Sequence, residues 1–125
     1  MPIAVVTSEV ETHELKSLPP DGYVTIRAMT YGQKLERQAL TSTMKMRGQG
    51  KKDFEAEMQM TNEKVSLLAF KYCVVDHNLT DENEQPLDLS NPIAVRRIRG
   101  KVGEEIETLI DKLNNFEDDE EVGNS

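Results

Sequence analysis

The spacing of apolar residues near the end of the chain constrains its fold more than any other feature. Five apolar side chains recur every three or four residues, which places them on one face of an α-helix: Val102, Ile106, Leu109, Ile110 and Leu113. Glu104 and Glu105 lie in the first turn, and Asn114 and Asn115 end the pattern. Because such a face must be covered, we expect this helix to pack on a core.

Capping signals predict three further helices. Thr30 and Gln33 have the spacing of a capping box, so a helix of about four turns should begin at Tyr31 and end near the glycines at 48 and 50. Thr61 is expected to cap a second helix, which is apolar over most of its circumference through Val74 and should be the central element. Asn91, followed by Pro92, predicts a short helix over residues 93–99.

Strands are expected in two places. The run Pro19-Pro20-Asp21-Gly22 is typical of a turn, and the β-rich residues 23–27 follow it, so residues near 14 to 29 should form a hairpin or two short strands. Apolar and polar residues alternate over residues 54–60, which predicts a third strand. The chain is therefore expected to be one α+β domain, mostly helical, with a small antiparallel sheet near the N-terminal half.

Length and charge suggest how the domain is bounded. A chain of 125 residues fits one core, and we expect residues 13–115 to form it, with residues 1–12 as a flexible arm. Five of the acidic residues that give a net charge of −8 fall together at positions 117–121, so residues 116–125 are expected to be a disordered acidic tail. Cys73 is the single cysteine, and no segment has the pattern of a membrane helix or signal peptide, so we expect a soluble cytoplasmic protein.

Two segments contain side chains that could form a chemical site. The oxygen-rich run from Asp76 to Glu82 resembles half of a calcium loop, but Asp81 stands where glycine is needed, and the alternative is a loop held by its own Asx-turns. Cys73, Asp76 and His77 contain the groups of a nucleophilic site, yet a single cysteine on a helix is more often part of the core. We therefore expect no enzymatic activity, no catalytic residue, no metal and no cofactor.

The basic run over residues 96–101 has three interpretations. It could contact nucleic acid or an acidic partner, form a solvated helix face, or contact the acidic tail of the same chain. Because the chain as a whole is negative and no aromatic residue stands beside the run, we expect neither nucleic-acid nor membrane binding.

Methionine and leucine side chains are the candidates for a partner-binding surface. Flexible thioether side chains suit adaptable apolar contacts, although the same residues could fill the core. The candidates are Leu35, Met44, Met58, Met60, Ile106, Leu109, Ile110 and Leu113.

Three segments carry a resemblance to a known family. They are THELKSLPPDGYVTIRAMTYGQKLERQ near the start, CVVDHNLTDENEQPLDLSNP in the middle and KVGEEIETLIDKLNN near the end. In these patches, which span roughly residues 12 to 115, the chain resembles the tail assembly chaperones of long-tailed bacteriophages.

The resemblance implies a role in virion morphogenesis. Such proteins bind the aggregation-prone tape measure protein in the host cytoplasm and keep it soluble for assembly of the tail tube, with the tail tube protein and self-association as further partners. A ribosomal frameshift often appends a second domain near the acidic terminus in this family. The alternative is a structural virion protein, a tail or head-tail joining component that stays in the particle.

Overall fold

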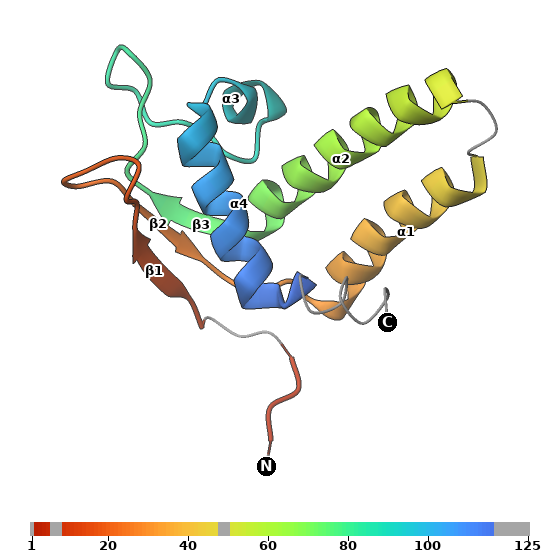
Figure 1. Cartoon of the computed structure of the whole chain (residues 1–125). Helices are drawn as coiled ribbons and strands as arrows, with labels where there is room; N and C mark the ends of the chain where they lie inside the picture. The colour runs from red at the N-terminus through yellow and green to blue at the C-terminus, as the bar shows by residue number, and fades with distance from the viewer. Residues whose placement is uncertain (1, 6–8, 48–50, 117–125) are drawn as a thin grey trace.

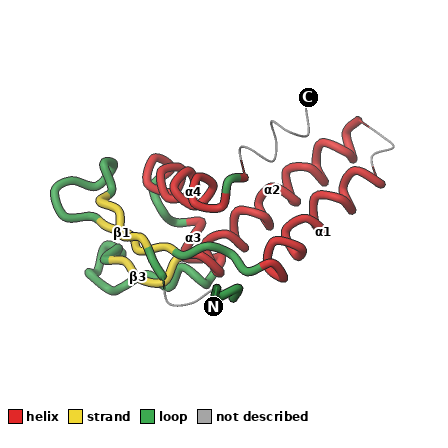
Figure 2. Tube along the Cα trace, turned by 90° about the horizontal axis from the view of Figure 1, so that it is seen from below, coloured by secondary structure: helices red, strands yellow, loops and turns green. Residues whose placement is uncertain are grey.

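A small sheet, a helix across it and a long helical hairpin make up the molecule (Figure 1). The computed structural model describes residues 2–5, 9–47 and 51–116, and of residues 42–47 and 51–58 it describes the backbone. Within that part of the chain, three antiparallel strands lie in the order β1-β2-β3, and α4 lies over one face of the sheet (Figures 1 and 2). The expected α+β class, mostly helical with a small antiparallel sheet, is confirmed.

The hairpin of β1 (Glu11–Glu14) and β2 (Tyr23–Ile26) forms around the predicted turn. The N–H of Leu15 donates to the carbonyl of Gly22 over 2.7 Å, which closes the loop. A Cβ on Gly22 would come within 2.6 Å of the Leu18 Cβ, so only glycine fits this close approach. β1 begins inside the segment expected to be an arm, whereas Ile3 and Val5 are exposed.

The third strand is not where the alternation predicted it. Residues 54–60 belong to α2 (Lys51–Cys73), so the strand prediction is wrong, and so is the prediction that a helix begins at Thr61. Glu, Ala, Met, Gln and Lys dominate this stretch, and their helix propensity prevails over a short period-two pattern. The third strand is instead β3 (Val74–His77), which follows α2 directly and pairs with β2.

The helical hairpin begins with the predicted capping box. The Thr30 hydroxyl accepts from the N–H of Gln33 over 3.1 Å, while the Gln33 side chain accepts from the N–H of Thr30 over 3.0 Å. α1 therefore begins at Tyr31 and runs to Arg47, and α2 returns beside it (Figure 2). The C-terminal half of α2 contacts α1, α3 and α4, which confirms its central place.

Two helices complete the domain. Asn91 caps α3 (Pro92–Arg96) by accepting from the N–H of Ile93 over 3.0 Å, as predicted, but the helix ends at Arg96 and not at Arg99. α4 (Gly100–Asn114) places Val102, Ile106 and Ile110 in the core, where they join side chains of β2 and the end of α2. Asn115, in the left-handed conformation with φ of 60°, ends α4.

A buried asparagine joins α4 to the end of α2 and to the segment between β2 and α1. Asn114 is 2% exposed, and its Oδ1 accepts from the N–H of Met29 over 2.8 Å. Its Nδ2 donates to the Ile110 carbonyl over 2.9 Å and lies 3.9 Å from the Cys73 Sγ. Phe116, assigned to the tail by sequence, is buried, and the Arg37 guanidinium lies 3.9 Å from its ring centroid. The remaining tail, residues 117–125, lies outside the described residues.

Candidate functional site

An open apolar groove lies where α1, α2 and α3 meet. Its volume is about 380 Å³, which is within the range of binding pockets. Its apolar lining comes from each wall: Leu40 of α1, Leu67 and Leu68 of α2, Pro92 and Val95 of α3, and Leu89 before α3. Leu89 is buried, while Leu40, Leu67, Leu68 and Val95 are half-buried, so their side chains fill part of the core and remain accessible.

Polar contacts hold the groove walls together. The Tyr72 hydroxyl donates to the Glu36 carboxylate over 2.6 Å and joins α2 to α1. This hydrogen bond to a carboxylate raises the pKa of Tyr72. On the other wall, the Arg96 Nε lies 2.5 Å from the Glu63 carboxylate and joins α3 to α2. These two contacts connect all three helices that line the groove.

Two lysines border the groove along α2. Lys64 and Lys71 are both exposed, and they lie on the same face of the helix because seven residues make two turns. Within the described part of the chain, neither lysine forms an ion pair with a carboxylate. Glu36 borders the groove from α1. The groove thus has a basic edge on one helix and an acidic group on another.

The candidate binding residues lie in different environments. Met60 is 59% exposed and stands one turn before Lys64, on the face of α2 that carries the groove. Leu35 is 45% exposed on α1 but does not line the groove. The side chains of Met44 and Met58 lie outside the described residues.

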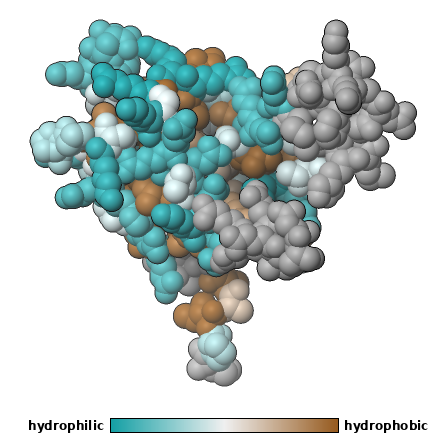
Figure 3. All heavy atoms as spheres, in the orientation of Figure 1, coloured by the Kyte–Doolittle hydropathy of each residue, from teal (hydrophilic) through white to brown (hydrophobic). Residues whose placement is uncertain are grey.

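The candidates on α4 belong to the core. Ile106 and Ile110 are fully buried, and Leu109 and Leu113 are half-buried and packed against that core. This is the alternative that the sequence left open for them, so we do not place them on a binding surface. Figure 3 shows that the face seen in Figure 1 is mainly hydrophilic, with hydrophobic residues in separate patches and on the N-terminal segment below the sheet.

Sequence reasoning missed the groove. The available signal is the breadth of the apolar face of α2, which predicts a central helix but not a groove. Leu67 and Leu68 belong to that face, and one side of it is left partly open between α1 and α3.

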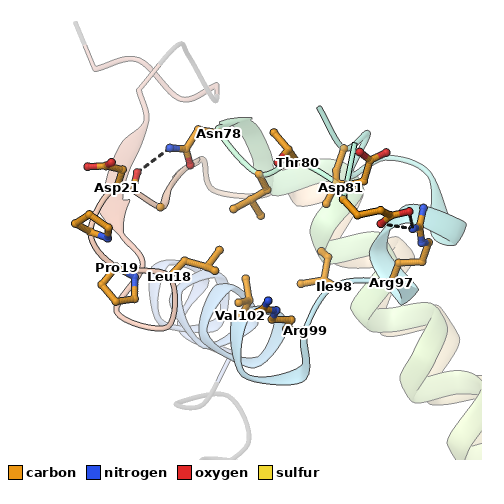
Figure 4. A pocket seen from close by; sticks show the side chains of 15 residues that line it. Leu18, Pro19, Asp21, Asn78, Thr80, Asp81, Arg97, Ile98, Arg99 and Val102 are labelled. Carbon is orange, nitrogen blue, oxygen red and sulfur yellow. Dashed lines mark hydrogen bonds and ion pairs between the residues drawn. The ribbon is translucent and has the colours of Figure 1, made fainter. Parts of the chain in front are cut away.

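A second, larger pocket of about 540 Å³ lies at the start of α4 (Figure 4). It is bounded by the β1–β2 loop, residues 78–87 and the start of α4. Asn78 donates to the Asp21 carbonyl over 2.7 Å, and its Oδ1 accepts from the N–H of Tyr23 over 2.9 Å. Arg97 contacts both oxygens of Glu82 over 2.9 and 2.8 Å. These polar side chains serve to hold the two loops in place.

The loop that resembles a calcium site is closed by its own hydrogen bonds. The Asp81 Oδ1 accepts from the N–H of Gln85 over 3.0 Å and from that of Asn83 over 2.8 Å. These backbone hydrogen bonds, that of Gln85 first, lower the pKa of Asp81. The Asx-turn interpretation is confirmed. Among the described residues, no three His, Cys, Asp or Glu side chains are grouped to hold a metal ion.

Cys73 lies in the core. Its side chain is fully buried, and this burial raises its pKa to about 11, which keeps the sulfur as an unreactive thiol near neutral pH. His77 uses its Nδ1 to accept from the N–H of Leu79 over 2.9 Å, and Asp76 accepts from the Tyr23 hydroxyl over 3.2 Å. The three side chains are therefore engaged separately, which favours the core interpretation of Cys73.

Two arginines of the basic run form ion pairs with glutamates. Arg96 and Arg97 form ion pairs with Glu63 and Glu82, whereas Arg99 and Lys101 are exposed. A contact with residues 117–125 lies outside the described part. None of the helices described has the length and apolar character needed to cross a membrane.

Comparison of the chain with protein-family models, with curated proteins and with solved structures finds no match.

Proposed function

We propose that this chain is a non-enzymatic phage tail assembly chaperone, which binds the tape measure protein and keeps it soluble in the host cytoplasm until the tail tube assembles. The open apolar groove between α1, α2 and α3 carries the proposal. The identity of the client comes from the resemblance to the tail assembly chaperones.

The groove suits a client that would otherwise aggregate. Its apolar walls offer replacement contacts for an exposed apolar face, and its edges are charged, so the free protein does not present a broad apolar surface. A net charge of −8 would also keep complexes apart in solution. Both properties support a holding role rather than a chemical one.

Co-expression with the adjacent tape measure protein tests this function. We expect the tape measure protein to stay soluble and to copurify with the chain. Leu68→Asn should weaken the complex about tenfold, because Leu68 is already half-buried and binding adds only part of the about 1.5–3 kcal/mol for full burial of a leucine side chain.

Val75→Gln is the matched control, since Val75 is 44% exposed on β3, away from the groove. Its complex should be as tight as that of the wild type, and circular dichroism should show both variants folded. An insoluble tape measure protein, together with this chain at fixed stoichiometry in purified particles, would overturn the proposal and favour the structural virion protein.

A further inference from the structure

The two lysines beside the groove form a spaced pair. Lys64 and Lys71 lie two turns apart on α2, about 10 Å along the helix, with Leu67 and Leu68 between them. Both are exposed, and in the described residues neither reaches a carboxylate. In a chain with a net charge of −8, this places two cations without a carboxylate partner among the described residues beside an apolar surface, and the Lys71 Nζ lies 5.5 Å from the centroid of the Tyr72 ring.

The groove walls constrain the backbone of an occupant. The two long walls are the helices α1 and α2, whose backbone N–H and carbonyl groups are bonded within each helix except at the ends, and the third wall is the short helix α3 with Leu89 and Ser90 before it. An extended segment would find no strand edge there with which to pair. An occupant that buries apolar side chains in this groove must therefore satisfy its own backbone hydrogen bonds, as a helix does.

The edges of the groove differ in charge. The α2 edge carries Lys64 and Lys71, while the α1 edge carries Glu36, held by the Tyr72 hydroxyl. At the α3 edge, Arg96 is already paired with Glu63. An occupant with carboxylates toward α2 would meet complementary charge, and one with carboxylates toward α1 would not.

We infer that the groove takes an amphipathic helix with two acidic residues seven positions apart on one flank, which Lys64 and Lys71 recognise. This inference rests on the proposed function, because it specifies the client segment for the same groove. It adds a sequence requirement and a single orientation, with the acidic flank on α2.

The test uses the full chain and two fluorescent, end-capped helical peptides. Both carry leucines at i, i+3, i+4 and i+7, and they differ only in two flanking positions seven residues apart, which are glutamate in one and lysine in the other. We expect the glutamate peptide to bind about tenfold more tightly at low salt, and the preference to shrink as salt screens the pairs. In the double variant Lys64→Glu/Lys71→Glu the lysine peptide should bind more tightly.

The double variant Lys101→Glu/Lys112→Glu is the matched control, because both lysines are exposed on α4 and neither lines the groove. It should keep the wild-type preference. Equal binding of the two peptides, no binding of either, or the same preference in all three proteins would overturn the inference.

The inference and the proposed function fail separately. Tape measure protein that copurifies equally well with wild type and Lys64→Glu/Lys71→Glu would overturn the inference and leave the chaperone role intact. A peptide preference that reverses as expected, with no copurification of tape measure protein, would support the inference and overturn the choice of client.

Discussion

Asn114→Ala should destabilise the domain far more than the removal of an ordinary polar side chain. The substitution removes the side-chain oxygen that accepts from the N–H of Met29, and Met29 is only 4% exposed. An unsatisfied buried donor costs about 1–3 kcal/mol. The lost hydrogen bond to the Ile110 carbonyl and the void left by the amide add to it, so we expect a loss of about 2–4 kcal/mol.

Equilibrium unfolding in urea, followed by far-UV circular dichroism, measures this loss. With a slope of about 1–3 kcal/mol per molar, the midpoint should fall by roughly 1 M or more while the slope stays unchanged. Asn62→Ala is the control, because Asn62 is exposed within α2 and alanine favours the helix, so its stability should change by less than about 0.5 kcal/mol. Equal midpoints for Asn114→Ala and wild type would refute the assigned role of Asn114.

Three further predictions concern local interactions. Thr30→Ala should cost about 1 kcal/mol by removing the cap of α1, and an unchanged thermal midpoint would contradict it. Burial in the folded state raises the pKa of Cys73 from an ordinary value of 9.0 to about 11. The free energy of unfolding should therefore fall as pH rises from 9.0 toward about 11, by up to about 2–3 kcal/mol relative to Cys73→Ala. Parallel pH profiles of the two proteins would count against this. Partial burial raises the pKa of Glu105, but the hydrogen bonds from Ser17 and from the N–H of Lys16 outweigh this effect and lower the pKa overall. NMR titration should therefore place the pKa of Glu105 below the usual glutamate range, and Ser17→Ala should raise that pKa.

Local signals in the sequence predicted several element boundaries. The capping pairs at Thr30 and Asn91 act within three residues, so the helix starts at Tyr31 and Pro92 follow from sequence alone. The stripe of α4 was also clear, because one face is apolar and the other is charged. These elements depend little on the rest of the chain.

The failures arose where the sequence offers two competing local patterns. Residues 54–60 alternate as a strand would, yet helix-forming residues continue α2 through them. The helix expected from Thr61 includes Val74, but Val74 and Val75 belong to β3, which pairs with β2. A β-branched pair directly after a helix was the available signal.

The groove could not be found from sequence, because its lining comes from three separate segments. Leu40, Leu68 and Val95 each fit an ordinary core position, and their meeting depends on how the hairpin and α3 pack. Sequence could identify Met60 as an exposed apolar residue, but not that its helix face continues into a groove.

Amide hydrogen exchange on the chain alone and in complex with the tape measure protein tests the central claim most directly. The account predicts increased protection around the groove, in residues 36–40, 64–71 and 89–95, with β1 and β2 unchanged. Protection confined to the sheet or to the larger pocket at the start of α4, with the groove segments unchanged, would contradict it.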